Sequence, residues 1–193
     1  MLEAAATHLE RLDGALSALS HEHLEALAEI LFRAYRNDKQ VFTLGNGGSS
    51  STASHIAADL AKNTIGPNMR RFRISSLNEN AAIVTALAND LGYEYVFVEQ
   101  LVNLIRAGDV LVVVSASGNS PNVLHAMRYA RAQSAEVVGL LGFDGGEAAK
   151  LADVALVVPS DDYGVVEDVH LVINHILVKH FKARLEEAHP WVV

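Results

Sequence analysis

The chain has 193 residues, of which 50% are hydrophobic and 20% are charged; this suits one well-buried domain and is short for two. Its formal net charge of -8 disfavours a broad contact with nucleic-acid phosphates, and the absence of cysteine excludes disulfides, thiol nucleophiles and cysteine-based zinc sites. The first residues mix Leu and Ala with charged side chains, unlike a signal peptide, and no run approaches the roughly 20 apolar residues of a membrane span. We therefore expect a cytoplasmic protein that binds neither nucleic acid nor a membrane.

Apolar segments of strand length alternate with amphipathic segments of helix length, which is typical of a parallel sheet flanked by helices. The predicted strands, all expected to be buried, are 40–44, 71–75, 110–115, 137–141 and 154–158. The predicted helices between them are 50–62, 81–88, 121–133 and 147–151, with turns at Gly66-Pro67 and Gly145-Gly146. We expect an α/β fold in a single domain, 1–193, with one or two helices in 1–37, a core in 38–160, and a C-terminal helix (165–187) and tail in 161–193.

The first glycine-rich loop, Gly45-Asn-Gly-Gly-Ser49, follows a predicted strand and precedes a predicted helix. Such a position suits a dinucleotide, but Ser50 replaces the third glycine of the Rossmann pattern, and its side chain occupies space that close helix packing needs. No Lys follows at the offset that a P-loop requires. A different anionic ligand remains open for this loop.

The second loop, Ser115-Ala-Ser117-Gly-Asn-Ser120, also follows a predicted strand, and Pro121 begins the next helix. Three serines, with Gly118 allowing an unusual backbone turn, present hydroxyl and N–H groups to an anion at a helix N-terminus, which suits a phosphomonoester. A solvent-exposed polar turn is the alternative, because serine-rich caps are common. Two such loops at the carboxyl ends of parallel strands favour the ligand site.

These two loops, together with Asp144-Gly-Gly, resemble the sugar isomerase (SIS) family and, within it, the phosphoheptose isomerases. The resemblance covers nearly the whole chain, including 88–90, 108–111 and the acidic, histidine-containing last helix. It implies the SIS fold, a flavodoxin-like three-layer α/β/α arrangement around a five-stranded parallel sheet with an N-terminal helical extension. It also implies isomerisation of sedoheptulose 7-phosphate to D-glycero-D-manno-heptose 7-phosphate through an enediol or enediolate, in a homotetramer with shared active sites.

The resemblance assigns roles to particular residues. The substrate phosphate and sugar are expected against Ser115, Ala116, Ser117, Ser120, Asn46, Gly47, Gly48, Ser49, Asp90 and Glu167. Asp59 is the expected catalytic base, and His175 is its expected acid–base partner. The phosphoheptose isomerases carry glutamate at the position of Asp59, so the carboxylate here is one methylene shorter, a difference of about 1.5 Å.

Zinc is the expected cofactor, because two helices each offer a nitrogen and an oxygen ligand. His55 and Asp59 lie four residues apart, and Glu167 and His175 lie eight apart. Some members of the family hold zinc at these positions, where Glu167 is usually glutamine. The metal would polarise the substrate carbonyl or only anchor the helices. Without the resemblance, His55 and Asp59 fit an ordinary surface pair, and Glu167 fits an acid near a helix N-terminus.

Two other functions stay open. A non-catalytic SIS module that senses a sugar phosphate or binds a protein partner would keep the serine loop, and the shorter side chain of Asp59 leaves room for this alternative. The joint presence of His55, Asp59, Glu167 and His175 argues against it. An isomerase of a hexose or pentose phosphate is the other alternative, because the sequence says little about the length of the substrate.

Overall fold

The computed structural model describes residues 1–66 and 70–188 and contains a five-stranded parallel sheet in the order β2-β1-β3-β4-β5. The strands are β1 (Gln40–Gly45), β2 (Arg73–Ser76), β3 (Val110–Ser115), β4 (Glu136–Leu141) and β5 (Val154–Val157). Each strand begins and ends within two residues of its predicted bounds. The predicted α/β fold is confirmed.

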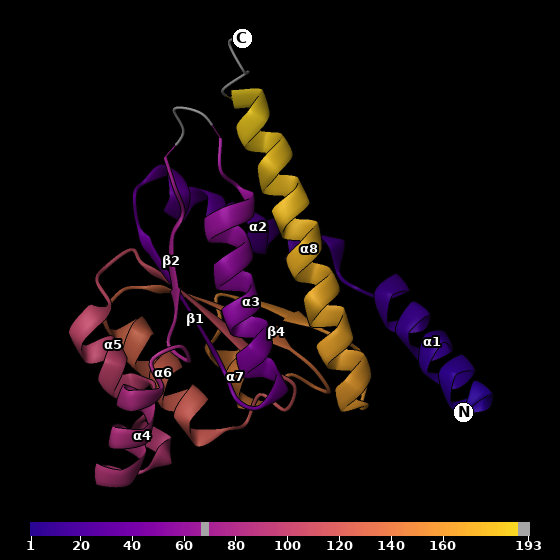
Figure 1. Ribbon diagram of the computed structural model, residues 1–193, viewed down its shortest axis with the longest axis horizontal. Coiled ribbons are helices and arrows are strands. Elements are labelled where there is room, and N and C mark those ends of the chain that lie inside the picture. The colour runs from indigo at the N-terminus through magenta and orange to yellow at the C-terminus, as the bar shows by residue number, and fades with distance from the viewer. Residues whose placement is uncertain (67–69, 189–193) are drawn as a thin grey trace.

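Helices connect the strands, and further helices precede the first strand and follow the last one (Figure 1). They are α1 (Leu2–Ser17), α2 (His21–Arg36), α3 (Gly48–Asn63), α4 (Ala81–Asp90), α5 (Val98–Leu104), α6 (Pro121–Ala132), α7 (Gly146–Leu151) and α8 (Tyr163–Ala188), with a 3₁₀ turn η1 (Tyr93–Tyr95). Sequence reasoning missed η1 and α5, because segments this short show no clear helical period. Pro67 of the predicted turn and the tail 189–193 lie outside the described residues.

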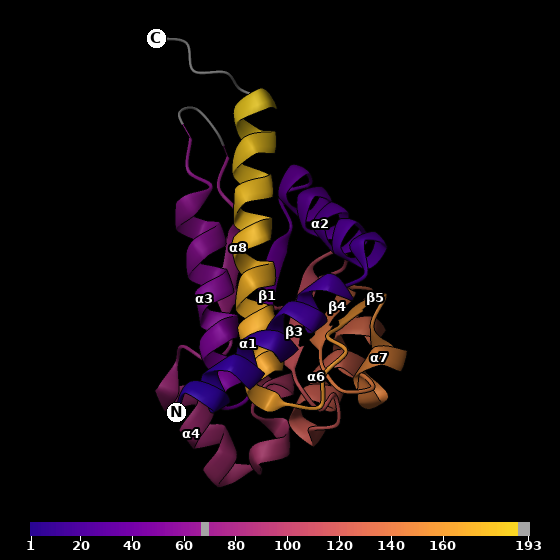
Figure 2. The same ribbon diagram turned by 90° about the vertical axis from the view of Figure 1, so that its right-hand side faces the viewer.

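Two helical layers cover the sheet, as the alternation of side chains along β3 makes clear. Val110, Val112 and Val114 pack with α2, α3 and α8, whereas Leu111 and Val113 pack with α5, α6 and α7. All five of these side chains are buried, because a central parallel strand faces helices on both sides. The views in Figures 1 and 2 show the long α8 running beside α3 on one face. The three-layer arrangement is therefore the predicted one.

The two edge strands correct one expectation. All five strands were expected to be buried, but β2 and β5 each have only one buried residue. Both lie at the margins of the sheet, where the helical layers end and one side of the strand has no neighbouring strand. Arg73 at the start of β2 is exposed, in keeping with this position.

The glycine-rich loop and the serine loop both lie at the carboxyl ends of the strands. Parallel strands end on the same side, so β1 ends at Gly45 beside Val114 of β3, and β3 ends at Ser115 beside Leu141 of β4. Helices α3 and α6 begin directly after β1 and β3 at this edge. Within residues 1–66 and 70–188, no helix combines the length and apolar character needed to cross a membrane.

Candidate active site

The carboxyl edge of the sheet carries a pocket of about 290 Å³, which we call the serine pocket. It lies where β1 and β3 end and where α3 and α8 begin. Its lining residues are Asn46, Gly47, Gly48, Ser49, Ser115, Ala116, Ser117, Ser120, Tyr163 and Glu167. The structure thus brings together all the residues predicted to contact the substrate except Asp90.

Asp90 lies elsewhere on the surface of the chain. It is the last residue of α4, it is exposed, and its carboxylate accepts a hydrogen bond of 2.8 Å from the neighbouring Asn89 side chain. It is not among the residues that line the serine pocket. A contact between Asp90 and the sugar therefore stays a prediction.

Glycine backbone forms the side of the serine pocket between β1 and α3. Gly47 has a φ of 54°, in the left-handed region that favours glycine. A Cβ atom on Gly45 would lie 2.5 Å from the carbonyl oxygen of Ser49. A Cβ atom on Gly48 would collide with the carboxylate of Glu167, which reaches over from α8. The glycines therefore let the helix start at the end of the strand and let Glu167 approach the loop backbone.

The serine loop is held in a fixed turn at the start of α6. Gly118 has a φ of 63°, and a Cβ atom there would collide with the carbonyl group of Gly145. The Ser115 hydroxyl accepts a hydrogen bond of 3.1 Å from the Gly118 amide, which leaves the hydroxyl proton free to donate. Ser120 precedes α6 and makes no side-chain capping bond. Hydroxyl groups and the first amides of α6 therefore meet on one side of the pocket.

Two asparagines tie the glycine loop to the serine loop. Asn46 and Asn122 exchange side-chain hydrogen bonds of 3.0 and 2.9 Å, and the Tyr93 hydroxyl donates to the same Asn46 oxygen at 2.9 Å. Asn122 is buried, so its amide has no exposed alternative partner. Sequence reasoning missed Asn122, Tyr93 and Tyr163. For Asn122 a signal existed, since a polar residue directly after the serine motif falls on the first turn of a helix that packs on the sheet.

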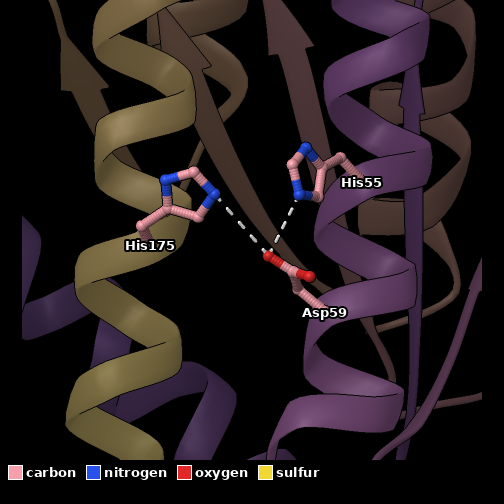
Figure 3. A group of neighbouring side chains, drawn as sticks. All are labelled: His55, Asp59 and His175. Atoms are coloured by element: carbon pink, nitrogen blue, oxygen red, sulfur yellow. Dashed lines mark ion pairs between the residues drawn. The ribbon is translucent and has the colours of Figure 1, made fainter.

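A second polar cluster lies on α3 and α8. We call His55, Asp59 and His175 the His–Asp group; their ligand atoms all lie within 4.8 Å of one another. The Asp59 Oδ2 atom is 3.2 Å from His55 Nε2 and 3.9 Å from His175 Nε2. Figure 3 shows the two imidazole rings pointing from separate helices toward the same carboxylate oxygen. The Asp59 side chain is 16% exposed, against 42% for His55 and 54% for His175.

The donor set of the His–Asp group fits a zinc ion. Ligand atoms around a tetrahedral zinc ion lie about 3.4 Å apart, because bonds to nitrogen and oxygen are about 2.1 Å long. The separations of 3.2 and 3.9 Å are close to this value. Two imidazole nitrogens and one carboxylate oxygen would leave a fourth position for water or substrate.

Glu167 does not join the His–Asp group, although the sequence analysis placed it in the same metal set. It precedes His175 by eight residues on α8, about 12 Å along the helix axis, and its carboxylate lies against Gly48 in the serine pocket. The four-residue set expected from the sequence is therefore a three-residue group in the structure, with Glu167 in the neighbouring pocket.

Another histidine of α8 is buried beneath the site. His170 is fully buried, and its Nε2 atom donates to the Leu141 carbonyl at 3.1 Å. Burial lowers the pKa of His170 to about 4, so the ring is neutral at physiological pH. Its neutral form with the proton on Nε2 leaves Nδ1 as an acceptor, for which the described residues supply no donor.

Comparison with known proteins agrees with this geometry. Residues 6–142 match the model of the SIS domain family. A phosphoheptose isomerase of Sulfurimonas denitrificans is 40% identical over 154 residues, which cover 80% of this chain and 78% of that protein. The solved structure of phosphoheptose isomerase GmhA from Neisseria gonorrhoeae has a TM-score of 0.86 and 30% identity, and the match covers 94% of this chain and 96% of that chain.

A second solved structure shares the fold alone. The NanR protein of Vibrio vulnificus, solved in complex with ManNAc-6P, has a TM-score of 0.67 at 18% identity, over 96% of this chain and 61% of that chain. The two phosphoheptose isomerases are 40% and 30% identical to this chain, whereas the NanR protein is 18% identical. The chain belongs to the SIS domain family and, within it, to the phosphoheptose isomerases.

Proposed function

We propose that the chain isomerises sedoheptulose 7-phosphate to D-glycero-D-manno-heptose 7-phosphate. The observation that carries the proposal is the serine pocket, in which two loops from neighbouring strands close around one cavity at the carboxyl edge of the sheet. The name shared by the relatives supports the choice of a heptose phosphate over other sugar phosphates.

The substrate phosphate would bind at the serine loop. The first amides of α6 and the hydroxyls of Ser115, Ser117 and Ser120 offer hydrogen-bond donors from one side. No Lys or Arg is among the residues that line the pocket. The charge of the phosphate would therefore be met by hydroxyl groups and by the positive end of the helix dipole, which allows reversible binding.

The sugar hydroxyls would bind along the opposite side of the pocket. Asn46 and Ser49 offer amide and hydroxyl groups, and Glu167 offers acceptor oxygens. The hydrogen bonds from Asn122 and Tyr93 hold Asn46 in one orientation before substrate arrives. Such preorganisation lowers the cost of fixing the sugar for reaction.

The reaction requires two proton transfers. C1 of the ketose loses a proton and C2 of the aldose gains one, while a proton moves from O1 to O2 through an enediol or enediolate. Asp59 would move the proton between the carbons as general base and then acid, and His175 would serve the oxygens. The carboxylate and the His175 ring already share one location, since Asp59 Oδ2 lies 3.9 Å from His175 Nε2.

We propose that the His–Asp group holds zinc. His55 Nε2, Asp59 Oδ2 and His175 Nε2 would be the ligand atoms, which leaves Asp59 Oδ1 and His175 Nδ1 for the proton transfers. When bound, the metal supplies Lewis-acid stabilisation of the negative charge on the enediolate oxygen. Its removal by a chelator would then lower turnover, and restoring zinc would recover it.

We also propose a cytoplasmic homotetramer with shared active sites. Gly48 of the serine pocket precedes His55 by seven residues on α3, about 10 Å of helix, so the pocket and the His–Asp group of one chain stand well apart. His55 and His175 are exposed, as are large apolar residues of α1 such as Leu2 and Leu9. Association would cover the apolar residues and bring the His–Asp group of one subunit to the pocket of another.

Proton NMR of the protein with sedoheptulose 7-phosphate in deuterated buffer tests the proposed reaction. We expect aldose signals and deuterium at C2 of the product, because the C1 proton exchanges with solvent while it is held by the base. Parallel samples with a hexose and a pentose ketose phosphate measure the preference for chain length. No exchange with sedoheptulose 7-phosphate, with and without zinc, contradicts the proposal.

A non-catalytic module that senses a sugar phosphate is the second candidate, because the NanR protein, which has the same fold, was solved in complex with the sugar phosphate ManNAc-6P. Such a protein would bind the sugar phosphate without converting it. Saturable chemical-shift changes of the protein in the same samples, with no product signals, would identify this function.

A further inference from the structure

Two asparagine side chains hold the carboxylate of Asp59. The Asn63 amide, one turn further along α3, donates to Oδ1 at 2.9 Å. The Asn174 amide, on α8 next to His175, donates to Oδ2 at 2.9 Å. We propose that Asn63 and Asn174 are positioning residues that fix the orientation of Asp59 for metal binding and proton transfer. This role rests on the proposed function, in which the His–Asp group is the reactive centre.

The burial of Asn174 points to such a role. Asn174 has no solvent-accessible surface, and its neighbours Ile173 and Leu177 on α8 are also buried. A carboxylate only accepts hydrogen bonds, so the Asn174 nitrogen must face Asp59 and its oxygen must face away. That oxygen is buried and has no partner among the described residues. Because an unpaired buried acceptor destabilises the fold, an apolar residue would serve stability better at this position.

The two amides act on opposite oxygens of the same carboxylate. The terminal torsion of aspartate is broad, so a single hydrogen bond leaves the group free to turn. With Oδ1 held by Asn63 and Oδ2 held by Asn174, rotation would break both bonds. The remaining lone pair of Oδ2 is then directed at the gap between His55 and His175, where the metal would lie.

The positioning role also connects the two helices of the site. Asn174 donates a hydrogen bond from α8 to Asp59 of α3, so the position of the base depends on how α8 packs. A bond that only joined the helices would affect unfolding but not the properties of a bound metal. Metal affinity and the spectrum of a metal probe therefore separate a positioning role from a structural one.

Asn174→Leu is the main test, because leucine has a similar size, removes the hydrogen bond to Asp59 and eliminates the unpaired oxygen of Asn174. We expect zinc affinity, measured by competition with a chromophoric chelator, to fall about 10- to 100-fold. We expect the visible absorption of the Co²⁺-substituted protein to change, kcat to fall and KM to stay close to wild type, since the serine pocket is untouched. The melting temperature should not fall. Asn103→Leu, an exposed change on α5 across the sheet, is the matched control and should change none of these.

Asn63→Ala provides the second test and keeps the proposal testable if Asn174→Leu fails to fold. Asn63 is only half-buried, and its loss should weaken zinc binding and kcat in the same direction. Wild-type zinc affinity, Co²⁺ spectrum and kcat in both variants would overturn the positioning role while leaving the isomerase intact. If the wild-type protein turns over without binding zinc, kcat alone decides. A wild-type protein that neither binds zinc nor turns over overturns the proposed function and this role with it.

Discussion

The serine pocket and the His–Asp group differ in what builds them. The pocket is made largely of backbone and short side chains from two loops, each fixed by a glycine in the left-handed region, Gly47 and Gly118. The His–Asp group consists of three side chains on α3 and α8, held at the ends of flexible torsions. The pocket is therefore shaped by local chain geometry, whereas the group depends on the packing of two helices far apart in sequence.

The contrast predicts how each region responds to change. A loop whose backbone offers the donors tolerates the loss of one hydroxyl, because neighbouring amides and serines continue to bind the phosphate. The His–Asp group tolerates the loss of a side chain less well, because each residue has a separate chemical role and a displacement of about 1 Å lowers the rate strongly. Substitutions in the His–Asp group should thus lower kcat strongly, and substitutions in the serine pocket should mainly raise KM.

The largest effect is expected for Asp59→Asn. The amide cannot accept the proton from C1, so kcat should fall by at least about 100-fold, the lower end of what general acid–base groups contribute. KM should change little, because the serine pocket is intact. Steady-state kinetics by NMR, with circular dichroism to verify the fold, measures this. Undiminished turnover would show that another group is the base.

The next effect concerns stability and the buried His170, which lies on α8 between Glu167 of the pocket and His175 of the His–Asp group. Its pKa is about 4 in the fold and about 6.5 when unfolded, so above pH 6.5 both states are neutral. As pH falls from 6.5 to 4, the unfolded chain takes up a proton that the fold does not. Stability should drop by about 3 kcal/mol over this range and level off below it.

Urea unfolding of wild type and His170→Gln, measured from about pH 7 to about pH 4, separates this contribution from that of the carboxylates. The range spans the pKa of the histidine in the unfolded chain and in the fold. Glutamine keeps an amide that can donate to the Leu141 carbonyl and does not titrate. The variant should lose less stability than wild type as the pH falls. Equal losses would mean that His170 is protonated inside the fold.

A smaller effect is expected for Ser117→Ala in the serine pocket. Losing one hydrogen bond to a charged group costs about 1.5–3 kcal/mol, at the low end here because other donors surround the phosphate. KM should rise about tenfold with kcat nearly unchanged. Ser50→Ala is a useful control, because that hydroxyl donates to the Gly47 carbonyl at 2.7 Å and is not among the lining residues. A fall in kcat alone would contradict the assignment of Ser117 to phosphate binding.

The same contrast explains what the sequence could reveal. The strands and the two loops were predictable because apolar runs, glycines and serines act over a few residues. The pairing of His55 with Asp59 followed from helical spacing, but their approach to His175 required the packing of α3 on α8. Glu167 lies in the pocket and not beside His175, because eight residues of α8 separate the two side chains by about 12 Å along the helix axis. Asn174 was overlooked because a polar residue on an apolar helix face is explained only by the partner it meets.

The smallest effect is expected for Glu167→Gln, which tests the separation of the two regions directly. Removing one negative charge beside the pocket should strengthen binding of the anionic substrate, and an interaction of at most about 1 kcal/mol corresponds to a two- to fivefold lower KM. Zinc affinity should not change, because the Glu167 carboxylate lies against Gly48 and outside the His–Asp group. A clear loss of zinc affinity would instead mean that Glu167 reaches the metal, either within the chain or from another subunit, and that the pocket and the His–Asp group form one continuous site.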